Sequence, residues 1–136
     1  MTALRNLVMV LAVACASVVA WPTTAGAEVV VTPGDHYAAI AYSPATGSYG
    51  YSYGCATSSR AEAIALGHCK GEDARIVCWV HNGFCALAVG DDRSCWGIGY
   101  TYGPGANNID ARQRALNECA QRTTGAHIVV SICSEN

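Results

Sequence analysis

Apolar and polar positions along this chain follow two kinds of pattern, and the same order of patterns occurs twice. Compact apolar or alternating runs predict strands, whereas apolar residues spaced three and four apart predict helices. The first set predicts strand, strand, helix and strand, at residues 37–42, 49–53, 60–69 and 75–80. The second set predicts the same order, at residues 86–89, 95–102, 110–121 and 127–132.

Short strings of residues recur between the two sets. Residues 39–42 recur as residues 86–89, and the glycine-aromatic string at 49–53 recurs as residues 96–100. A repeat of this kind indicates the architecture of the chain rather than its chemistry. We therefore expect a single α+β domain over 37–136, with a mainly antiparallel sheet and two helices. It would consist of two ββαβ-like repeats related by pseudo-twofold symmetry, at about 37–83 and 84–133.

Helix starts and one turn can be assigned from short motifs. Ser59 with Glu62, and Asp110 with Gln113, have the spacing of capping boxes and predict where the two helices begin. Asn82-Gly83 favours a two-residue hairpin, whose turn needs positive φ at both residues. Such a hairpin places four residues on one sheet face: Cys78, Val80, Cys85 and Leu87. A helix on that face would bring Cys69 near Cys78 or Cys85.

The second strand of each repeat has aromatic residues at every other position and small residues between them. This alternation gives each strand one aromatic face and one nearly bare face. If the helices lie on the bare face, the aromatic rows form an outward binding surface; if they lie on the aromatic face, the rows are core. The candidate binding residues are Tyr49, Tyr51, Tyr53, Trp96, Tyr100 and Tyr102.

The first 27 residues are typical of a cleavable secretory signal, with Arg5, an apolar stretch and the cleavage motif Ala25-Gly26-Ala27. A lead-in segment follows at 28–36, so the chain is expected to be secreted or in the cell envelope. Eight cysteines are present, one of them within the signal. In an exported chain the others predict disulfides, with one left over from the odd number. The disulfide candidates are Cys55, Cys69, Cys78, Cys85, Cys95, Cys119 and Cys133.

Net charge and motif context argue against nucleic-acid binding, hydrolase activity and metal binding. A net charge of −2 removes the electrostatic case for binding nucleic acid, and no later segment predicts membrane insertion. Residues 50–54 match G-x-S-x-G, but this nucleophile motif needs a sharp strand-to-helix turn in a large hydrolase fold. Five residues that lie close together in the sequence are candidate zinc ligands, but disulfide bridges would compete for the same thiols: His68, Cys69, Cys78, His81 and Cys85. We expect no metal, no cofactor and no catalytic residue.

Five separate strings resemble the domain of unknown function 4189 family, found in small secreted proteins of mycobacteria and other actinobacteria. They lie at residues 37–43, 49–53, 59–63, 76–80 and 82–90. The resemblance implies a secreted α+β domain without established enzymatic activity, some relatives of which are regarded as effectors that act on host cells. It also implies bridging cysteines at Cys69, Cys85 and Cys133; this chain departs from the pattern in its additional Cys55, Cys78 and Cys95.

The leading hypothesis is a secreted, non-enzymatic, cystine-stabilised module that binds a protein partner, with host proteins among the candidates. A second hypothesis is a thiol-dependent or hydrolytic enzyme that uses the odd cysteine or Ser52. A third is a periplasmic or cell-wall inhibitor, or a glycan-binding module, since tyrosine and tryptophan rows also suit sugars.

Overall fold

The computed structural model of this chain describes residues 34–135. The predicted signal peptide at 1–27 and most of the predicted lead-in segment lie outside the described residues. The first four described elements are β1 (Tyr37–Tyr42), β2 (Tyr49–Cys55), α2 (Ser58–His68) and β3 (Arg75–His81). The next four are β4 (Gly83–Val89), β5 (Trp96–Tyr102), α3 (Asn108–Ala120) and β6 (His127–Cys133). The same order of elements therefore occurs twice, as the sequence pattern predicts.

The strands form two antiparallel three-stranded sheets, where the sequence suggested one. β1 is the central strand of the first sheet, between β2 and β3, and β4 is central in the second, between β5 and β6. Both hydrogen-bonding edges of each central strand are occupied by strands of its own set, so the other two strands of each sheet are edge strands. The predicted α+β class and antiparallel pairing are confirmed.

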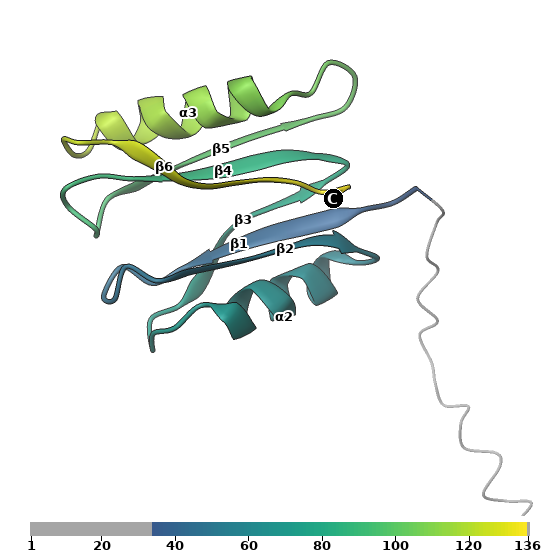
Figure 1. Ribbon diagram of the computed structural model, residues 1–136, viewed down its shortest axis with the longest axis horizontal. Helices are drawn as coiled ribbons and strands as arrows, with labels where there is room; N and C mark the ends of the chain where they lie inside the picture. The colour runs from purple at the N-terminus through teal and green to yellow at the C-terminus, as the bar shows by residue number, and fades with distance from the viewer. Residues whose placement is uncertain (1–33, 136) are drawn as a thin grey trace, which may run out of the picture. The chain divides into compact units, whose positions relative to one another are not determined.

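Figure 1 shows these elements stacked as layers, with a helix outside each sheet and the two sheets between them. The cluster between the sheets is apolar and draws on both central strands, with β3 and β6 contributing at the sides. Its buried members are Ala38, Ile40, Tyr42, Cys78, Val80, Cys85, Leu87, Val89 and Ile132. Each helix packs on the outer face of its own sheet, over alanines of the central strand.

Tyr42 ties the two sheets together at one end of this core. It is 1% exposed, and its hydroxyl donates a hydrogen bond of 2.9 Å to the carbonyl oxygen of Arg93, in the turn before β5. The Arg93 guanidinium in turn donates to the carbonyl oxygen of Thr46, in the turn after β1. Because a buried hydroxyl is costly without a partner, this bond lets a large tyrosine fill the interface.

The predicted hairpin at Asn82-Gly83 is wrong, because β3 and β4 belong to different sheets. Asn82 alone has positive φ, at 49°, and its side chain accepts a hydrogen bond of 2.9 Å from the backbone N–H of His36. Gly83 already belongs to β4, where a Cβ would collide with the backbone of Thr101 and Tyr102. The glycine is thus needed for close approach to β5, and the chain crosses between sheets at one residue.

The crossover changes the meaning of the predicted shared face. Cys78 and Val80 do lie with Cys85 and Leu87, but they face one another across the gap between the sheets. The helices lie on the opposite faces, so Cys69 packs with Ala61 and Ala65 in the cluster beneath α2. The expectation that a helix brings Cys69 near Cys78 or Cys85 is therefore wrong.

Both helices begin earlier than the capping-box motifs predict. The side chain of Thr57 accepts a hydrogen bond from the backbone N–H of Arg60, and the side chain of Asn107 accepts one from Asp110. Both N-cap residues have extended backbone, which suits a residue that leaves a strand and opens a helix. The predicted capping positions, Ser59 and Asp110, lie inside the first turn.

Candidate functional site

The helices lie on the glycine faces of β2 and β5, which decides the orientation of the aromatic rows. A Cβ on Gly50 would meet the backbone of Ala65 and Cys69 in α2. Cβ atoms on Gly97 and Gly99 would collide with α3 in the same way. Glycine at these positions allows the helix backbone to approach the strand closely. The aromatic side chains are therefore turned to the opposite face of each strand.

The tyrosines of the two rows are open to solvent. Five of them are between 40% and 69% exposed: Tyr49, Tyr51, Tyr53, Tyr100 and Tyr102. Neighbouring rings lie nearly parallel, with centroids 6.4 Å apart for Tyr51 and Tyr53 and 6.1 Å apart for Tyr100 and Tyr102. The rows lie on edge strands, at the rim of the space between the sheets, so the central core does not cover them.

Trp96 departs from this pattern, although the sequence places it in the same row. It is partly buried against the core between the sheets, with its ring 5.6 Å from the ring of Tyr42. The guanidinium of Arg75 lies over the Trp96 ring, 4.8 Å from the ring centroid. Trp96 therefore supports the packing of the two sheets and is not part of the open surface.

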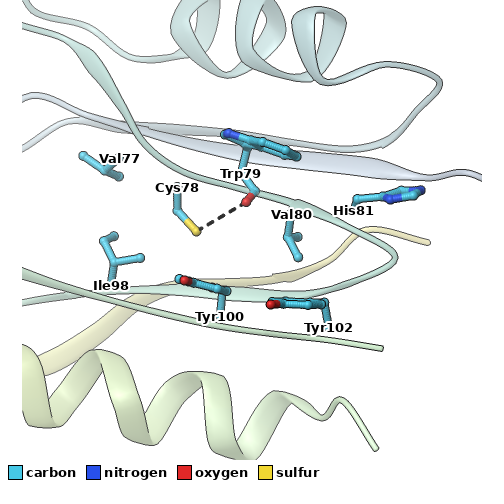
Figure 2. Close-up of a pocket in the computed structure, with 8 residues that line it drawn as sticks. All are labelled: Val77, Cys78, Trp79, Val80, His81, Ile98, Tyr100 and Tyr102. Carbon is cyan, nitrogen blue, oxygen red and sulfur yellow. Dashed lines mark hydrogen bonds between the residues drawn. The ribbon is translucent and has the colours of Figure 1, made fainter. Parts of the chain in front are cut away.

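A cavity of about 560 Å³ lies between β3 and β5. Figure 2 shows Cys78 and Val80 pointing from β3 toward Ile98 and Tyr100 of β5. The ring of Trp79 points to the other side of β3, toward the helix side, and the ring lies 6.2 Å from that of Tyr37. The lining from β5 is Ile98 with two tyrosines, and the lining from β3 is mixed, with two valines beside Cys78, Trp79 and His81.

Two further cavities flank β2, one on each of its faces. The cavity on the aromatic side has a volume of about 740 Å³ and lies between the tyrosine row and β6, where Val130 and Ile132 line it. The cavity on the helix side has a volume of about 450 Å³ and is lined by Ile64 and His68 of α2. The free edge of β2 is therefore bordered by hollows above and below.

The hydrogen bond in the turn before β2 shows which backbone N–H and C=O groups of this strand point to its free edge. Ser43 N–H donates to the carbonyl oxygen of Ser48 across that turn, so these two residues form a hydrogen-bonded pair. Because such pairs alternate with non-bonded pairs in an antiparallel ladder, the backbone groups of Tyr49 and Tyr51 point outward. Among the described residues, no hydrogen bond reaches the outward N–H and C=O groups of these two tyrosines.

The corresponding edge of β5 is covered by two arginines, Arg114 of α3 and Arg122 just after the end of that helix. The guanidinium of Arg122 donates a hydrogen bond of 2.8 Å to the carbonyl oxygen of Trp96, and Arg114 donates one of 3.1 Å to that of Tyr100. Charged side chains that cover an edge strand oppose pairing with another chain. Sequence reasoning missed this role, because Arg122 follows the end of α3 and no helical spacing links it to Arg114. The two aromatic strands thus differ: the edge of β5 is capped, whereas that of β2 is open at Tyr49 and Tyr51. Further along β2, the N–H of Gly54 donates a hydrogen bond of 2.8 Å to the carbonyl oxygen of Ser134.

The G-x-S-x-G motif has none of the geometry of a hydrolase nucleophile. Ser52 is buried within β2, and its hydroxyl donates a hydrogen bond of 2.7 Å to the carbonyl oxygen of Ala61 in α2. A nucleophile of this kind needs an exposed hydroxyl on a strand-to-helix turn, next to a base. The Ser52 hydroxyl instead links β2 to α2 through this hydrogen bond.

The five candidate zinc ligands do not gather at one site. Cys69 packs beneath α2, whereas Cys78 and Cys85 lie between the sheets. The His81 ring lies 2.8 Å from the carboxylate of Asp35 and stacks on Tyr37. Within residues 34–135, no group of three His, Cys, Asp or Glu side chains could hold a metal ion.

The seven described cysteines carry free thiols and divide among the layers. Cys78 and Cys85 are neighbours between the sheets, and their interaction together with burial raises the pKa of Cys85. Of the cysteines that the family resemblance implied, Cys69 lies beneath α2 and Cys133 lies opposite Phe84 in the β4–β6 ladder. Burial also raises the pKa of Cys69, so neither Cys69 nor Cys85 is activated by a lowered pKa.

The fold and its surfaces define a small α+β domain with exposed tyrosine rows on edge strands. The chain belongs to the family described as domain of unknown function (DUF4189), whose family model matches residues 37–133. This match confirms the resemblance seen in the sequence. No curated protein matches the chain, and no solved structure matches it. The helices in the described residues are too short or too polar to cross a membrane.

Proposed function

We propose that this chain is a secreted, non-enzymatic binding module that takes up an extended segment of a partner protein as an additional strand along β2. The observation that carries the proposal is the open edge of β2, which is bordered by a cavity on each face. Export rests on the predicted signal peptide at residues 1–27.

Main-chain pairing would supply the affinity. The outward backbone groups of Tyr49 and Tyr51 form a short row of unused donors and acceptors on a strand held rigidly by β1. An extended segment that pairs with this row satisfies its own backbone at the same time, which is the basis of recognition by strand addition. The arginine caps on β5 leave β2 as the more accessible of the two aromatic edges.

The two flanking cavities would supply selectivity. Alternate side chains of an added strand point to opposite faces of the sheet. One set would lie against the tyrosine row and the aliphatic residues of β6, and the other against Ile64 and His68 of α2. We therefore expect the partner segment to be uncharged and rich in apolar residues on the tyrosine side, because the described lining there carries no formal charge.

Two finer features belong to the same proposal. The repeated order of elements and the equal strand order in the two sheets support a pseudo-twofold relation between the repeats. Seven cysteines in an exported domain support stabilisation by disulfides. Both features would keep the β2 edge rigid, and a preorganised edge loses less conformational entropy on binding.

The test is selection of linear peptides from a displayed random library on immobilised wild-type protein. We expect enriched peptides with alternating apolar residues, bound with slowed amide hydrogen exchange at Tyr49 and Tyr51. Tyr51→Pro removes the outward N–H and should abolish binding, since proline is tolerated on the solvent side of an edge strand. Tyr51→Ala keeps the N–H and loses only the ring, so it should weaken binding and serve as the matched control.

Thermal unfolding of both variants separates binding from folding. The side chain of Tyr51 is 45% exposed, so its removal should change the free energy of unfolding by less than about 1 kcal/mol. Equal binding by wild type and Tyr51→Pro would contradict strand addition. Concentration-dependent dimerisation that Tyr51→Pro removes would assign the edge to a second copy of this chain and overturn the proposal of a different partner.

A further inference from the structure

We infer that Cys78 and Cys85 form a disulfide that joins the two sheets at the floor of the cavity between β3 and β5. This inference is independent of the proposed function, because it concerns a covalent bond within the chain. It also selects one partner for Cys78, a residue whose pairing the sequence leaves open.

The two thiols are brought together by the crossover at Asn82. Cys78 is the fourth residue of β3 and Cys85 the third of β4, and the chain between them turns from one sheet to the other at a single residue. Both side chains point into the space between the sheets, where Cys78 is 7% exposed and Cys85 is fully buried. The two residues belong to the same buried cluster between the sheets. A bridge here would join two side chains that the fold has already placed as neighbours.

The two thiols differ in their access to an oxidant, so they take different roles in forming the bond. Cys78 lines the cavity, so a small oxidant can reach its sulfur (Figure 2). Cys85 is enclosed by the core, and the neighbouring Cys78 thiol, followed by burial, raises its pKa, so Cys85 is not the first thiol to react. Cys78 is therefore the thiol that meets the oxidant first, and Cys85 is the one that completes the bond.

The oxidant we assign is a small-molecule or protein disulfide of the compartment that receives the chain. The thiolate of Cys78 attacks one sulfur of that disulfide, forming a mixed disulfide and releasing one thiol. The thiolate of Cys85 then attacks the sulfur of Cys78 and expels the second thiol. The two protein thiols lose two electrons, the external disulfide gains them, and the protons of Cys78 and Cys85 leave on the two released thiols.

The bond would also set the spacing of the cavity walls. Cys85 lies opposite Tyr100 in the β4–β5 ladder, so the sulfur on β4 is directly beside the tyrosine wall. Cys78 belongs to the facing wall on β3. A covalent link between Cys78 and Cys85 therefore fixes β3 at a set distance from the row that contains Tyr100 and Tyr102.

Peptide mapping tests the bond on the full chain, produced in an oxidising compartment and alkylated without reduction. Trypsin cleaves after Arg75 and next after Arg93, so one peptide, 76–93, contains both cysteines and no others. We expect this peptide without adducts and lighter by two hydrogen atoms, and with two adducts after reduction. Chymotryptic cleavage after Trp79 or Phe84 should leave the pieces joined until reduction.

Two alkyl adducts before reduction, or either cysteine linked to another peptide, would overturn the inference. Stability gives a second readout in the variant with Cys78→Ala and Cys85→Ala. Reduction should lower the melting temperature of the wild type more than that of the double variant, by roughly 10 °C for a short closed loop. Equal shifts would show that the bond is absent, whatever the result for peptide binding at β2.

Discussion

Gly99 of β5 lies directly against the backbone of Ala111 in α3, and a Cβ at Gly99 would overlap the Ala111 carbonyl oxygen. The same arrangement occurs at Gly50 against Ala65 and at Gly97 against Ala115. The two helices thus pack directly on the glycines that lie between the aromatic residues. Their close packing is the reason that the tyrosines are turned outward.

Gly99→Ala should destabilise the domain by about 3 kcal/mol, because the backbone of α3 must move to admit a methyl group. Gly67→Ala is the matched control: a Cβ at Gly67, in α2, meets nothing within 4 Å, and alanine should stabilise this helix by roughly 0.5–1 kcal/mol. Chemical denaturation measures both. A neutral Gly99→Ala would mean that α3 does not sit closely on β5.

Ser52→Ala should lower the free energy of unfolding by about 1 kcal/mol, since it removes the hydrogen bond to Ala61 at a buried site. Ser59→Ala, at an exposed residue of the first turn of α2, should change it by less than about 0.5 kcal/mol. An esterase activity present in the wild type and lost only in Ser52→Ala would contradict the non-enzymatic proposal. Screening both variants with activated esters makes that comparison.

Asp73 should make the domain more stable above the pKa of an unfolded aspartate than below it. The hydroxyl of Ser43 and the backbone N–H of Ala45 donate to its carboxylate and lower its pKa from 3.8. The contribution is therefore fully present above about pH 3.8 and is lost as the pH falls through the lower folded value. Melting temperatures across an acid titration should show a shallower decline for Asp73→Asn.

In Asp73→Asn, the remaining decline of the melting temperature with falling pH should come partly from Asp92. Its pKa is also lowered, first by the hydroxyl of Ser94 and then by the backbone N–H of the same residue. Adding Asp92→Asn should flatten the acid limb further. An unchanged acid limb in both variants would show that these turn carboxylates do not differ between the folded and unfolded chains.

Cys95 should be bridged to Cys119 in the exported protein. Burial, followed by the nearby Cys95 thiol, raises the pKa of Cys119, and a Cβ on Gly97, two residues after Cys95, would touch the Cys119 side chain. In an unreduced tryptic digest, peptide 94–112 should remain joined to peptide 115–122. Peptide 61–70, which contains Cys69, serves as the comparison, because the position matching Cys95 in the first repeat is Ser48. Separate, fully alkylated peptides would contradict the pairing.

Much of the local structure could be predicted from the sequence. β1 spans the predicted residues, and the other elements differ from the predicted ones by a few residues at their ends. The helix starts were misplaced because Thr57 and Asn107 compete with later residues that fit the capping motif equally well. The alternation of glycine and tyrosine in β2 also identified two faces correctly, but it could not say which face the helix would take.

The sequence by itself determined the order of the elements, their repetition and the two-faced character of β2 and β5, because periodicity and turn chemistry act over a few neighbouring residues. The tertiary structure decided that β3 and β4 enter different sheets and that Cys78 and Cys85 share the core between them. It also decided that two arginines cap the edge of β5 while β2 stays open at Tyr49 and Tyr51. Those outcomes depend on which strands compete for the edges of β1 and β4 and on which faces can be buried together. That competition involves residues far apart in the chain, so no local pattern contains it.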